Sequence, residues 1–433
     1  MDKIHVRRLF CWLISILAVT LCVFPKTILP DDQGQKLNVL LITIDTLRAD
    51  RLSCYSFRHL RTANIDSLAS RGILFTRAFA NTSTTLPSHT NILLGTTPNC
   101  HGVHDNANFV VRDELVTLAE HLKGFGYSTA AFIGGFPLAS RFGLSQGFDT
   151  YDEKFEKIDV KGEESGERRA EAVVEKALGW LEGRKSPWFL WIHCYDPHDP
   201  YEPPEPFKTQ YKNRPYDGEV AYVDKVMGNL WRYLEENGLF QNTVIVFTGD
   251  HGESLGEHGE KTHGFLAYNT TLWVPLIILC PGLKPGKVNQ NVSHLDIFPT
   301  VCDILKIEKP NFLQGISLLA CLRGKKQREQ PIYFESLSPY YNMGWAPLRG
   351  YIHSGEKFID SPIPEIYDLK KDFNEVANLA SERKMDDCKE QLDKIVRLQS
   401  SEKPKQAQQK MDKETQERLR SLGYIANIPE TRK

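Results

Sequence analysis

Short apolar runs of six or seven residues recur along the chain and alternate with longer amphipathic segments. The runs are rich in β-branched and aromatic side chains, which is typical of strands buried on both faces of a sheet. These strand candidates are residues 38–44, 73–79, 128–133, 188–194, 244–249 and 274–279. The helix candidates between them are residues 64–71, 114–123, 167–182 and 220–236. The alternation predicts an α/β fold with a doubly wound, mostly parallel central sheet and helices on both faces.

The pattern changes near residue 309, where the strand candidates become shorter. Four of them, at residues 331–334, 348–352, 357–359 and 365–369, predict a small C-terminal α+β subdomain with a few antiparallel strands. A charged segment of helical character follows, whose charge is most simply a solvated face. The expected organisation is an N-terminal segment (1–36), a main domain (37–308), a small subdomain (309–380) and a charged helical tail (381–433).

The N-terminal segment has the pattern of a targeting signal. Lys3, Arg7 and Arg8 precede an apolar run at residues 9–24, which Pro25 closes. Positive charge before an apolar run is typical of a secretory signal or a signal anchor. We favour an uncleaved anchor over a cleaved signal because no small-x-small cleavage pattern follows. The prediction is a single-pass, membrane-anchored protein whose main domain is extracytoplasmic, either periplasmic or extracellular.

Charge and cysteine usage exclude some alternatives. The 433 residues carry a net charge of -2, so bulk electrostatics gives no support for a nucleic-acid partner. Of the nine cysteines, two lie in the apolar N-terminal run, and the other seven form no CxxC pair. The sequence therefore predicts neither a disulfide framework nor a zinc knuckle.

Metal-ligating side chains follow two of the strand candidates. Asp45 comes directly after residues 38–44, and Asp250 and His251 come directly after residues 244–249. Open α/β sheets place their sites at the carboxyl ends of strands. Two carboxylates and an imidazole suit a divalent cation: calcium or magnesium if oxygen ligands dominate, zinc or manganese if more histidines join. The alternative is an acidic surface loop.

A hydroxyl side chain stands at the predicted start of another helix. Thr85 precedes Leu86 and Pro87, and proline is tolerated in the first turn of a helix. A hydroxyl there faces unpaired backbone N–H groups and the positive end of the helix dipole, which suits a tetrahedral oxyanion. A cation beside Thr85 would lower the pKa of its hydroxyl and stabilise a phosphoryl or sulfuryl group in transfer. The alternative is a threonine that merely caps the helix.

Two loops carry further candidates for contact with an anionic substrate. Asp196 and His198 lie in a proline-rich loop after residues 188–194, and a rigid backbone suits a preorganised site. Lys261 and His263 follow the Asp250–His251 pair and could each meet an anion. Proline-rich loops are more often structural.

Several motifs, in this order, resemble the sulfatase family of the alkaline phosphatase superfamily. They are Asp45-Thr-Leu-Arg-Ala-Asp50, Thr85-Leu-Pro-Ser-His-Thr-Asn-Ile-Leu-Leu-Gly95, Asp196-Pro-His-Asp-Pro-Tyr201 and Gly249-Asp-His-Gly-Glu-Ser-Leu-Gly-Glu-His-Gly259. With later blocks, the resemblance spans about residues 38–424. It implies an alkaline-phosphatase-like fold and a metal-dependent hydrolase.

The resemblance also implies roles for individual residues. Asp45, Asp250 and His251 would be metal ligands, and Thr85 would be the nucleophile and a further ligand of the metal. His198 matches the histidine that contacts the anionic group of the substrate. A substrate-contacting lysine of the family corresponds to His263, with Lys261 as the alternative.

The chain departs from the family at the nucleophile. Sulfatases carry Cys or Ser, oxidised to formylglycine, in a C/S-x-P-x-R pattern, whereas this chain has Thr85, Pro87 and His89 at those positions. Threonine cannot become an aldehyde because its β-carbon carries a methyl group, so no formylglycine is expected. Sister families with a threonine nucleophile form a phospho-threonine. By similarity to their two-metal members, Asp196, His198 and His263 are a possible second metal site.

The sequence thus predicts a membrane-anchored, metal-dependent hydrolase of a sulfuric or phosphoric ester. Its expected substrate is a sulfated or phosphorylated small molecule, glycan or lipid headgroup. One alternative is a phosphodiesterase or phospho-headgroup transferase that acts through a phospho-threonine intermediate. The other is a non-catalytic binder of sulfated or phosphorylated glycans.

Overall fold

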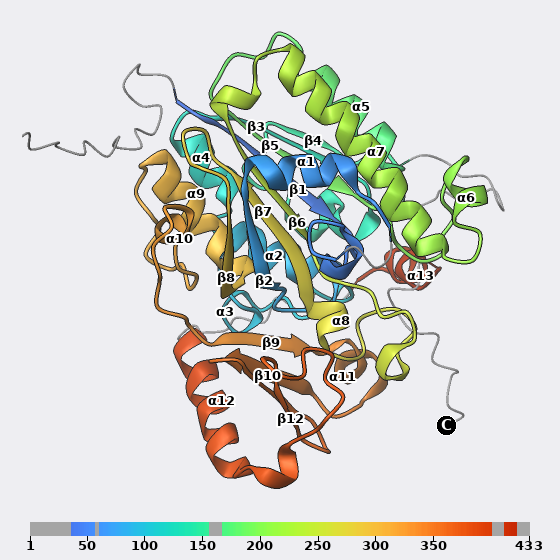
Figure 1. Cartoon of the computed structure of the whole chain (residues 1–433), viewed down its shortest axis with the longest axis vertical. Helices are drawn as coiled ribbons and strands as arrows, with labels where there is room; N and C mark the ends of the chain where they lie inside the picture. Colours follow the sequence, from blue (N-terminus) through green and yellow to red (C-terminus); the bar gives the residue numbers. More distant parts are fainter. Residues whose placement is uncertain (1–35, 57–59, 156–166, 401–410, 422–433) are drawn as a thin grey trace, which may run out of the picture.

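Two β-sheets organise the protein, whose computed structural model describes residues 36–56, 60–155, 167–400 and 411–421 (Figure 1). The large sheet has eight strands in the order β4-β3-β5-β1-β6-β7-β2-β8. In chain order they are β1 (Asn38–Ile44), β2 (Ile73–Phe79), β3 (Ser128–Ile133), β4 (Thr150–Asp152), β5 (Trp188–Cys194), β6 (Thr243–Gly249), β7 (Trp273–Leu279) and β8 (Gly286–Ser293). Only β7 runs antiparallel to its neighbours, β6 and β2. The predicted mostly parallel sheet is confirmed.

Alternate residues of each central strand enter different apolar clusters on the two faces of the sheet. Leu40 and Ile42 of β1 belong to the cluster that covers one face, and Val39 and Leu41 belong to the cluster on the other. On the first face lie α1 (Ala63–Arg71), α5 (Ala170–Leu181) and α7 (Pro215–Glu236); on the second lie α2 (Thr85–Leu94), α4 (Leu118–Gly124) and α9 (Ile297–Leu305). Helices on both faces confirm the doubly wound architecture.

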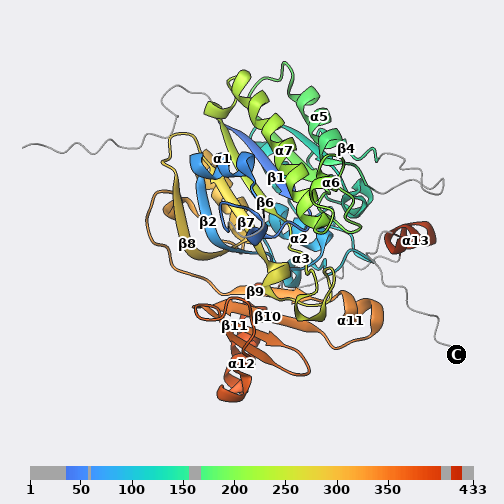
Figure 2. The same ribbon diagram turned by 45° about the vertical axis from the view of Figure 1, so that its right-hand side comes forward.

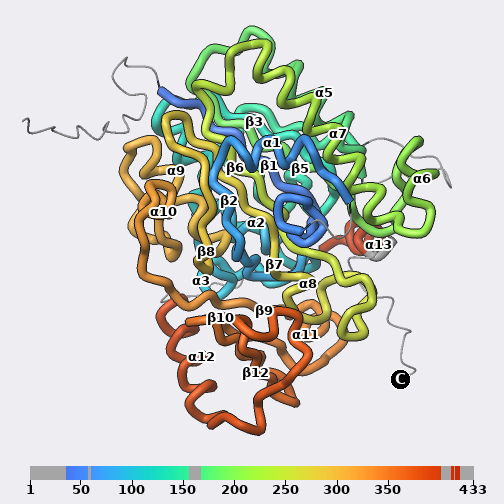
Figure 3. Tube along the Cα trace, viewed as in Figure 1, coloured from blue at the N-terminus to red at the C-terminus, as the bar shows by residue number. Residues whose placement is uncertain are grey.

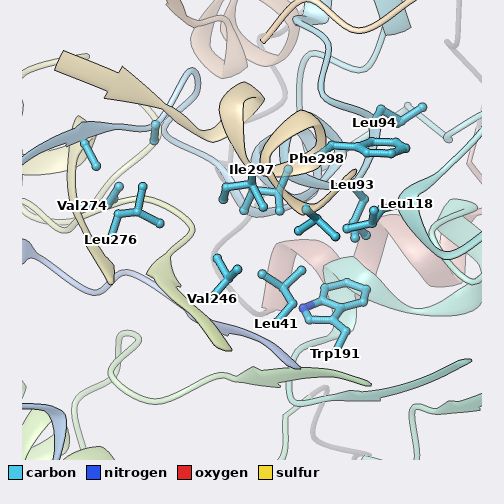
Figure 4. Close-up of a cluster of buried hydrophobic side chains, with 14 of the residues drawn as sticks. Leu41, Leu93, Leu94, Leu118, Trp191, Val246, Val274, Leu276, Ile297 and Phe298 are labelled. Carbon is cyan, nitrogen blue, oxygen red and sulfur yellow. The ribbon is translucent and has the colours of Figure 1, made fainter. Parts of the chain in front are cut away.

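The helix α2 lies in the second of these layers and is buried at all ten positions. Figure 4 shows its Leu93 beside Phe298 of α9, with Leu41 and Trp191 of the sheet beneath them. A helix can be buried on all sides when its side chains are apolar or hydrogen-bonded all round. The burial fixes the position of its N-terminal turn.

Several elements differ from the expectations, among them one helix and one strand. The helix predicted at residues 114–123 begins at Leu118, because the side chain of Thr117 accepts a hydrogen bond from the N–H of Glu120 in a capping box. The strand β8 was not predicted, because its first half, which includes Lys287, Asn289 and Gln290, is mostly polar and solvent-facing. An edge strand with polar side chains has no apolar pattern to reveal it.

The small sheet is antiparallel and lies below the large one in Figures 1 and 2. Its order is β12-β11-β10-β9, with β9 at Ile332–Ser336, β10 at Leu348–His353, β11 at Glu356–Asp360 and β12 at Glu365–Asp368. The helix α12 (Met385–Gln399) packs Leu392 and Ile395 against Tyr351 and Phe358 of this sheet. The segment expected as a charged tail thus contributes a helix to the small sheet, because one stripe of α12 is apolar.

The two sheets are joined just before α2. From α10 (Leu319–Leu322) the chain runs down to β9 (Figure 3). There the N–H of Glu335 donates to the carbonyl of Asn81 at 3.0 Å, and the side-chain amide of Asn81 donates to the carbonyl of Tyr333 at 2.7 Å. The small sheet therefore anchors the segment that leads into the N-terminus of α2.

A buried ion pair makes a second joint. The ammonium of Lys357 on β11 contacts the carboxylate of Glu375 and lies 3.2 Å from the side-chain oxygen of Asn269. Glu375 also accepts the backbone N–H of Asn269 at 2.6 Å. Lys357 is fully buried, and its pKa is lowered because burial outweighs the attraction of Glu375. The pair links the small sheet to the start of α8 (Asn269–Leu272).

Replacing Lys357 by alanine is expected to destabilise the protein by about 3–5 kcal/mol, because it leaves the Glu375 carboxylate buried without its cation. Lys371→Ala, at a lysine whose side chain is 86% exposed in a 3.8 Å ion pair with Asp368, should change stability by less than about 0.5 kcal/mol. Urea unfolding measures both. Equal effects of the two substitutions would show that the buried pair contributes nothing specific.

The predicted membrane anchoring requires a correction. In the described ranges no helix combines the length and the apolar character needed to cross a membrane. The apolar run at residues 9–24, on which the prediction of a single-pass, extracytoplasmic protein rested, lies outside the described residues. That prediction is contradicted, and nothing below depends on a membrane.

Candidate active site

Three metal-ligating side chains meet where β1 and β6 end. These strands are parallel neighbours at the centre of the sheet, with Ile44 opposite Gly249, so Asp45 and the pair Asp250–His251 emerge side by side. The Nε2 atom of His251 lies 3.7 Å from Oδ1 of Asp45 and 3.4 Å from Oδ2 of Asp250. All three side chains are fully buried.

This cluster fits a divalent cation. The three ligand atoms lie within 4.8 Å of one another. Both carboxylate oxygens of Asp45 and Oδ2 of Asp250 are buried and have no hydrogen-bond partner among the described residues. His251 donates from Nδ1 to the carbonyl of Gly252 at 2.9 Å, which leaves the lone pair of Nε2 directed at the carboxylates. That tautomer is the one a metal ligand needs.

The electrostatics of the cluster are unfavourable in the protein alone. Burial raises the pKa of Asp45 and of Asp250. The nearby carboxylate of Asp45 adds to the increase in the pKa of Asp250. Burial lowers the pKa of His251 well below its usual range, and the neighbouring His263 adds to that effect. Three buried carboxylate oxygens without hydrogen-bond partners among the described residues, beside a neutral imidazole, favour the binding of a cation.

Thr85 faces this cluster from the start of α2. It is the first residue of the helix, after Thr84 as N-cap, and its Oγ1 lies 3.5 Å from Nε2 of His251. The next backbone N–H, of Leu86, donates to the side-chain oxygen of Asn106 at 2.7 Å. The Thr85 hydroxyl is therefore fixed beside the proposed metal ligands.

His89 holds the backbone of Thr85 from one turn further along. Its Nδ1 donates to the carbonyl of Thr85 at 2.8 Å, and its Nε2 accepts the hydroxyl of Thr43 at 2.9 Å. The oxygen of Thr43 in turn accepts the indole N–H of Trp191 at 3.0 Å. Burial lowers the pKa of His89 well below its usual range, so the imidazole is neutral and this direction of donation is the one that satisfies every group.

Two further histidines extend from the cluster. The ring centroid of His263 lies 4.5 Å from that of His251 and 5.0 Å from that of His198. Burial lowers the pKa of His263, but the carboxylates of Glu253, 3.1 Å from Nδ1, of Asp45 and of Glu260 together outweigh burial and raise the pKa to about 8. The raised pKa favours the protonated imidazole of His263 at neutral pH.

Neighbouring groups fix the orientation of His198. The hydroxyl of Tyr195 lies 2.6 Å from its Nδ1, and the carbonyl of Asp199 lies 2.7 Å from the same atom. The carbonyl can only accept, so Nδ1 carries the proton. Burial lowers the pKa of His198 to about 4.

Asp196 makes its contacts away from this group, and Lys261 lies at the surface. The carboxylate of Asp196 bonds the guanidinium of Arg169 at 2.7 Å and the N–H of Ala170 at 2.8 Å, so it stabilises the N-terminus of α5. Lys261 is exposed. In the part of the chain that the structure describes, Asp45, Asp250 and His251 are the only such cluster of three or more metal-ligating groups. A second site from Asp196, His198 and His263 is not assembled.

Three residues that the fold places here had no predicted role in the site. His193 Nε2 lies 3.6 Å from Asp45, and His294 Nε2 donates to the carbonyl of Gly249 at 2.9 Å. Asn106 holds the first turn of α2, as described above. Of the three, only His193 could have been found from the sequence, because it lies at the carboxyl end of the predicted strand β5, which pairs with β1. His294 and Asn106 come from distant segments.

The fold and the site together define a class of protein. The sheet is mostly parallel and ends in a buried carboxylate–imidazole cluster, which faces a hydroxyl at a helix N-terminus. Ester hydrolases of alkaline-phosphatase architecture have this arrangement. Residues 37–307 match the family described as sulfatase, and residues 256–402 match that described as N-sulphoglucosamine sulphohydrolase, C-terminal. The chain belongs to the sulfatase family.

Individual relatives are similar over most of their length. The uncharacterised sulfatase YidJ of Escherichia coli (strain K12) is 26% identical over 428 residues, covering 82% of this chain and 85% of the relative. An N-acetylglucosamine-6-O-sulfatase of Bacteroides thetaiotaomicron is 24% identical, covering 93% and 92%. The solved phosphonate monoester hydrolase of Agrobacterium radiobacter has a TM-score of 0.72 at 22% identity, covering 84% and 96%. The chain is an ester-hydrolysing enzyme of this family.

Proposed function

We propose that this enzyme hydrolyses a sulfuric or phosphoric ester with Thr85 as the nucleophile. The observation that carries the proposal is the position of the Thr85 hydroxyl, buried and 3.5 Å from His251 Nε2 at the N-terminus of α2. A hydroxyl that only capped the helix would bond a backbone N–H, and Thr85 instead points to the cluster. The helix N-terminus adds a positive field at the reacting group.

Asp45, Asp250 and His251 would hold the divalent cation, with Thr85 as a further ligand. When bound, the cation would lower the pKa of the Thr85 hydroxyl and offset negative charge on the transferring group. Two carboxylates and one imidazole are compatible with calcium, magnesium, manganese or zinc. His263, as a cation, and His198 would contact the anionic group of the ester.

The bonds change in two steps. The Thr85 oxygen attacks phosphorus or sulfur, loses its proton, and the bond to the alcohol oxygen of the substrate breaks, so that the alcohol leaves with a proton. Water then attacks the same phosphorus or sulfur, releases phosphate or sulfate, and returns the proton to the Thr85 oxygen. No aldehyde hydrate is required, in agreement with a threonine β-carbon that carries a methyl group.

A phosphoric ester, and in particular a diester, is the second candidate. It is favoured by His89, which stands where the sulfatase pattern has arginine and bonds the Thr85 backbone instead of supplying a cation. A threonine nucleophile that forms a phospho-threonine suits phosphorus, which accepts attack by an unmodified hydroxyl. Similarity to an N-acetylglucosamine-6-O-sulfatase supports including sugar esters among the substrates to be tested.

Parallel assays with an aryl sulfate, an aryl phosphate monoester and an aryl phosphodiester, each with calcium, magnesium, manganese or zinc, test the proposal. We expect turnover of at least one ester that depends on added metal and is lost with a chelator. A preference for the diester would establish the second candidate. Metal-independent turnover, or binding without turnover of any ester, would contradict the proposal and favour a glycan-binding protein.

A further inference from the structure

Three consecutive residues link the small sheet to the first turn of α2. They are His104, Asp105 and Asn106, which follow the short helix α3 (Pro98–His101). Figures 1 and 2 show α3 next to β9. The side chains of His104 and Asp105 contact β9 and the helix after it, and that of Asn106 contacts α2. One short segment therefore touches both the small sheet and the residue after Thr85.

His104 forms an ion pair with Glu335 on β9. Its Nδ1 donates to Oε1 of Glu335 at 2.7 Å, and the hydroxyl of Tyr333 donates to the other carboxylate oxygen at 2.7 Å. Burial lowers the pKa of His104, but the carboxylates of Glu335 and Asp105 outweigh burial and raise it. Hydrogen bonds between charged partners are about twice as strong as neutral ones. The ion pair therefore holds His104 against the small sheet.

Asp105 makes a second contact, with the helix α11 (Ser338–Met343) that follows β9. The side-chain amide of Asn342 donates to Oδ2 of Asp105 at 2.7 Å, and Asp105 is fully buried. The ring centroid of Tyr341, on the same helix, lies 5.9 Å from that of His104. Because two adjacent side chains are bound from two elements, the backbone of this segment is fixed relative to the small sheet.

Asn106 extends this constraint to the peptide group between Thr85 and Leu86. Its side-chain oxygen accepts the N–H of Leu86 at 2.7 Å, and Asn106 is buried. The carbonyl of the same peptide group accepts the Nδ1 proton of His89 at 2.8 Å. Side chains thus bind both polar atoms of one planar peptide group. Because that group is attached to the Cα atom of Thr85, its orientation sets the position of the Thr85 side chain.

We propose that Asn106 is a positioning residue for Thr85, and that His104 and Asp105 make its position depend on the small sheet. The inference rests on the proposed function, because this positioning affects the rate only if the Thr85 oxygen is the reacting atom. A displacement of a reacting group by about 1 Å can slow a reaction about 100-fold. The proposed metal ligands follow β1 and β6, so the positioning acts on the rate of reaction and not on metal binding.

Steady-state kinetics with the best ester of the assay panel test the proposal. Asn106→Ala should lower kcat about 30- to 100-fold, while KM and metal affinity stay within about twofold. Asn106→Asp keeps an acceptor oxygen for the Leu86 N–H in either protonation state, so its kcat should stay within about fivefold of the unsubstituted protein. A role in stability alone would not produce this rescue together with an unchanged KM.

A double-variant comparison tests the connection to the small sheet. His104→Ala should lower kcat about 3- to 10-fold in the unsubstituted protein and not at all in Asn106→Ala, because both changes act through one hydrogen bond. Glu335→Gln keeps the side-chain volume and makes the bond to His104 neutral, so it should lower kcat about 2- to 5-fold and replaces His104→Ala if that variant does not fold. Losses that multiply in the double variant would overturn the proposal.

Lys357→Ala is the matched control, because it breaks the other joint between the two sheets and contacts no residue of the His104–Asn106 segment. At a temperature where every variant is folded, it should leave kcat within about twofold. A loss of kcat as large as that of His104→Ala would show that any loosening of the small sheet slows the reaction. The specific role of the segment would then be wrong.

Hydrogen exchange measures the same contact without turnover. With no ester present, Asn106→Ala and His104→Ala should speed exchange of the Leu86 amide, which loses its acceptor or has it displaced, and Lys357→Ala should not. Mass spectrometry of overlapping peptides from residues 81–94 detects the change. Unchanged exchange in both variants, or faster exchange with an unchanged kcat, would overturn the positioning role. An active Thr85→Val protein would instead sink the proposed function, and the exchange rates would still report whether the small sheet holds the first turn of α2.

Discussion

Thr85→Val is expected to reduce turnover at least about 10⁴-fold, because it removes the oxygen that we propose as the nucleophile and leaves a side chain of the same shape. The residue is fully buried in the first turn of α2, so the methyl group of valine fits the space of the hydroxyl. Steady-state hydrolysis of the best ester in the assay panel measures the loss. Acid quenching of the unsubstituted protein during turnover, followed by peptide mass spectrometry, should find the phosphate or sulfate on Thr85.

Two variants separate this role from a structural one. Thr85→Ser keeps the oxygen and should keep turnover within about 100-fold, a much smaller loss than that of valine. Thr84→Val changes the adjacent N-cap threonine, whose side chain makes no capping hydrogen bond, and should leave turnover within a few fold. If Thr85→Val retained the rate of the unsubstituted protein, the nucleophile would be another group.

Asp45→Asn is expected to weaken metal binding and to stabilise the metal-free protein. It should weaken metal affinity by at least about 100-fold, since even groups that only support a ligand are worth about 10- to 100-fold. Without metal it should stabilise the fold by about 1–3 kcal/mol, because it removes a buried carboxylate whose two oxygens have no hydrogen-bond partner among the described residues. Metal content by mass spectrometry and melting midpoints with and without metal measure both effects.

Asp196→Asn is the matched control, because Asp196 is also buried but bonds Arg169 and the N-terminus of α5. It should leave metal content unchanged and destabilise the protein in both states. If Asp45→Asn bound metal as the unsubstituted protein does, the cluster would not be the metal site. Equal destabilisation by Asp45→Asn with and without metal would also show that the cluster is not the metal site.

The sequence predicted the central strands best, because their side chains carry the signal locally. Residues 38–44 and 188–194 are runs of buried apolar side chains, and both become strands with those bounds. The strand β8 and the early start of α7 at Pro215 escaped prediction. In both cases the local pattern is polar or mixed, and the element is held by packing against distant neighbours.

The sequence likewise predicted some residues of the candidate site and not the partners of others. Asp45, Asp250, His251 and Thr85 each follow a recognisable strand end or helix start, and the fold brings them together. Asp196 follows a strand end as well, yet its carboxylate is taken by Arg169 and Ala170. Spacing along the chain could not show which groups would bond the Asp196 carboxylate in the folded protein.

By itself, the sequence determined the fold class, the family and the central cluster, because alternating burial and motif order are local properties of the chain. The tertiary structure alone decided which histidines meet the cluster, that Lys261 faces solvent, and that α12 belongs to the small sheet. It also placed Trp345 beside Phe265, in the segment that follows His263, with ring centroids 6.1 Å apart. Contacts between segments tens to hundreds of residues apart depend on how the layers pack, and no pattern within one segment records them.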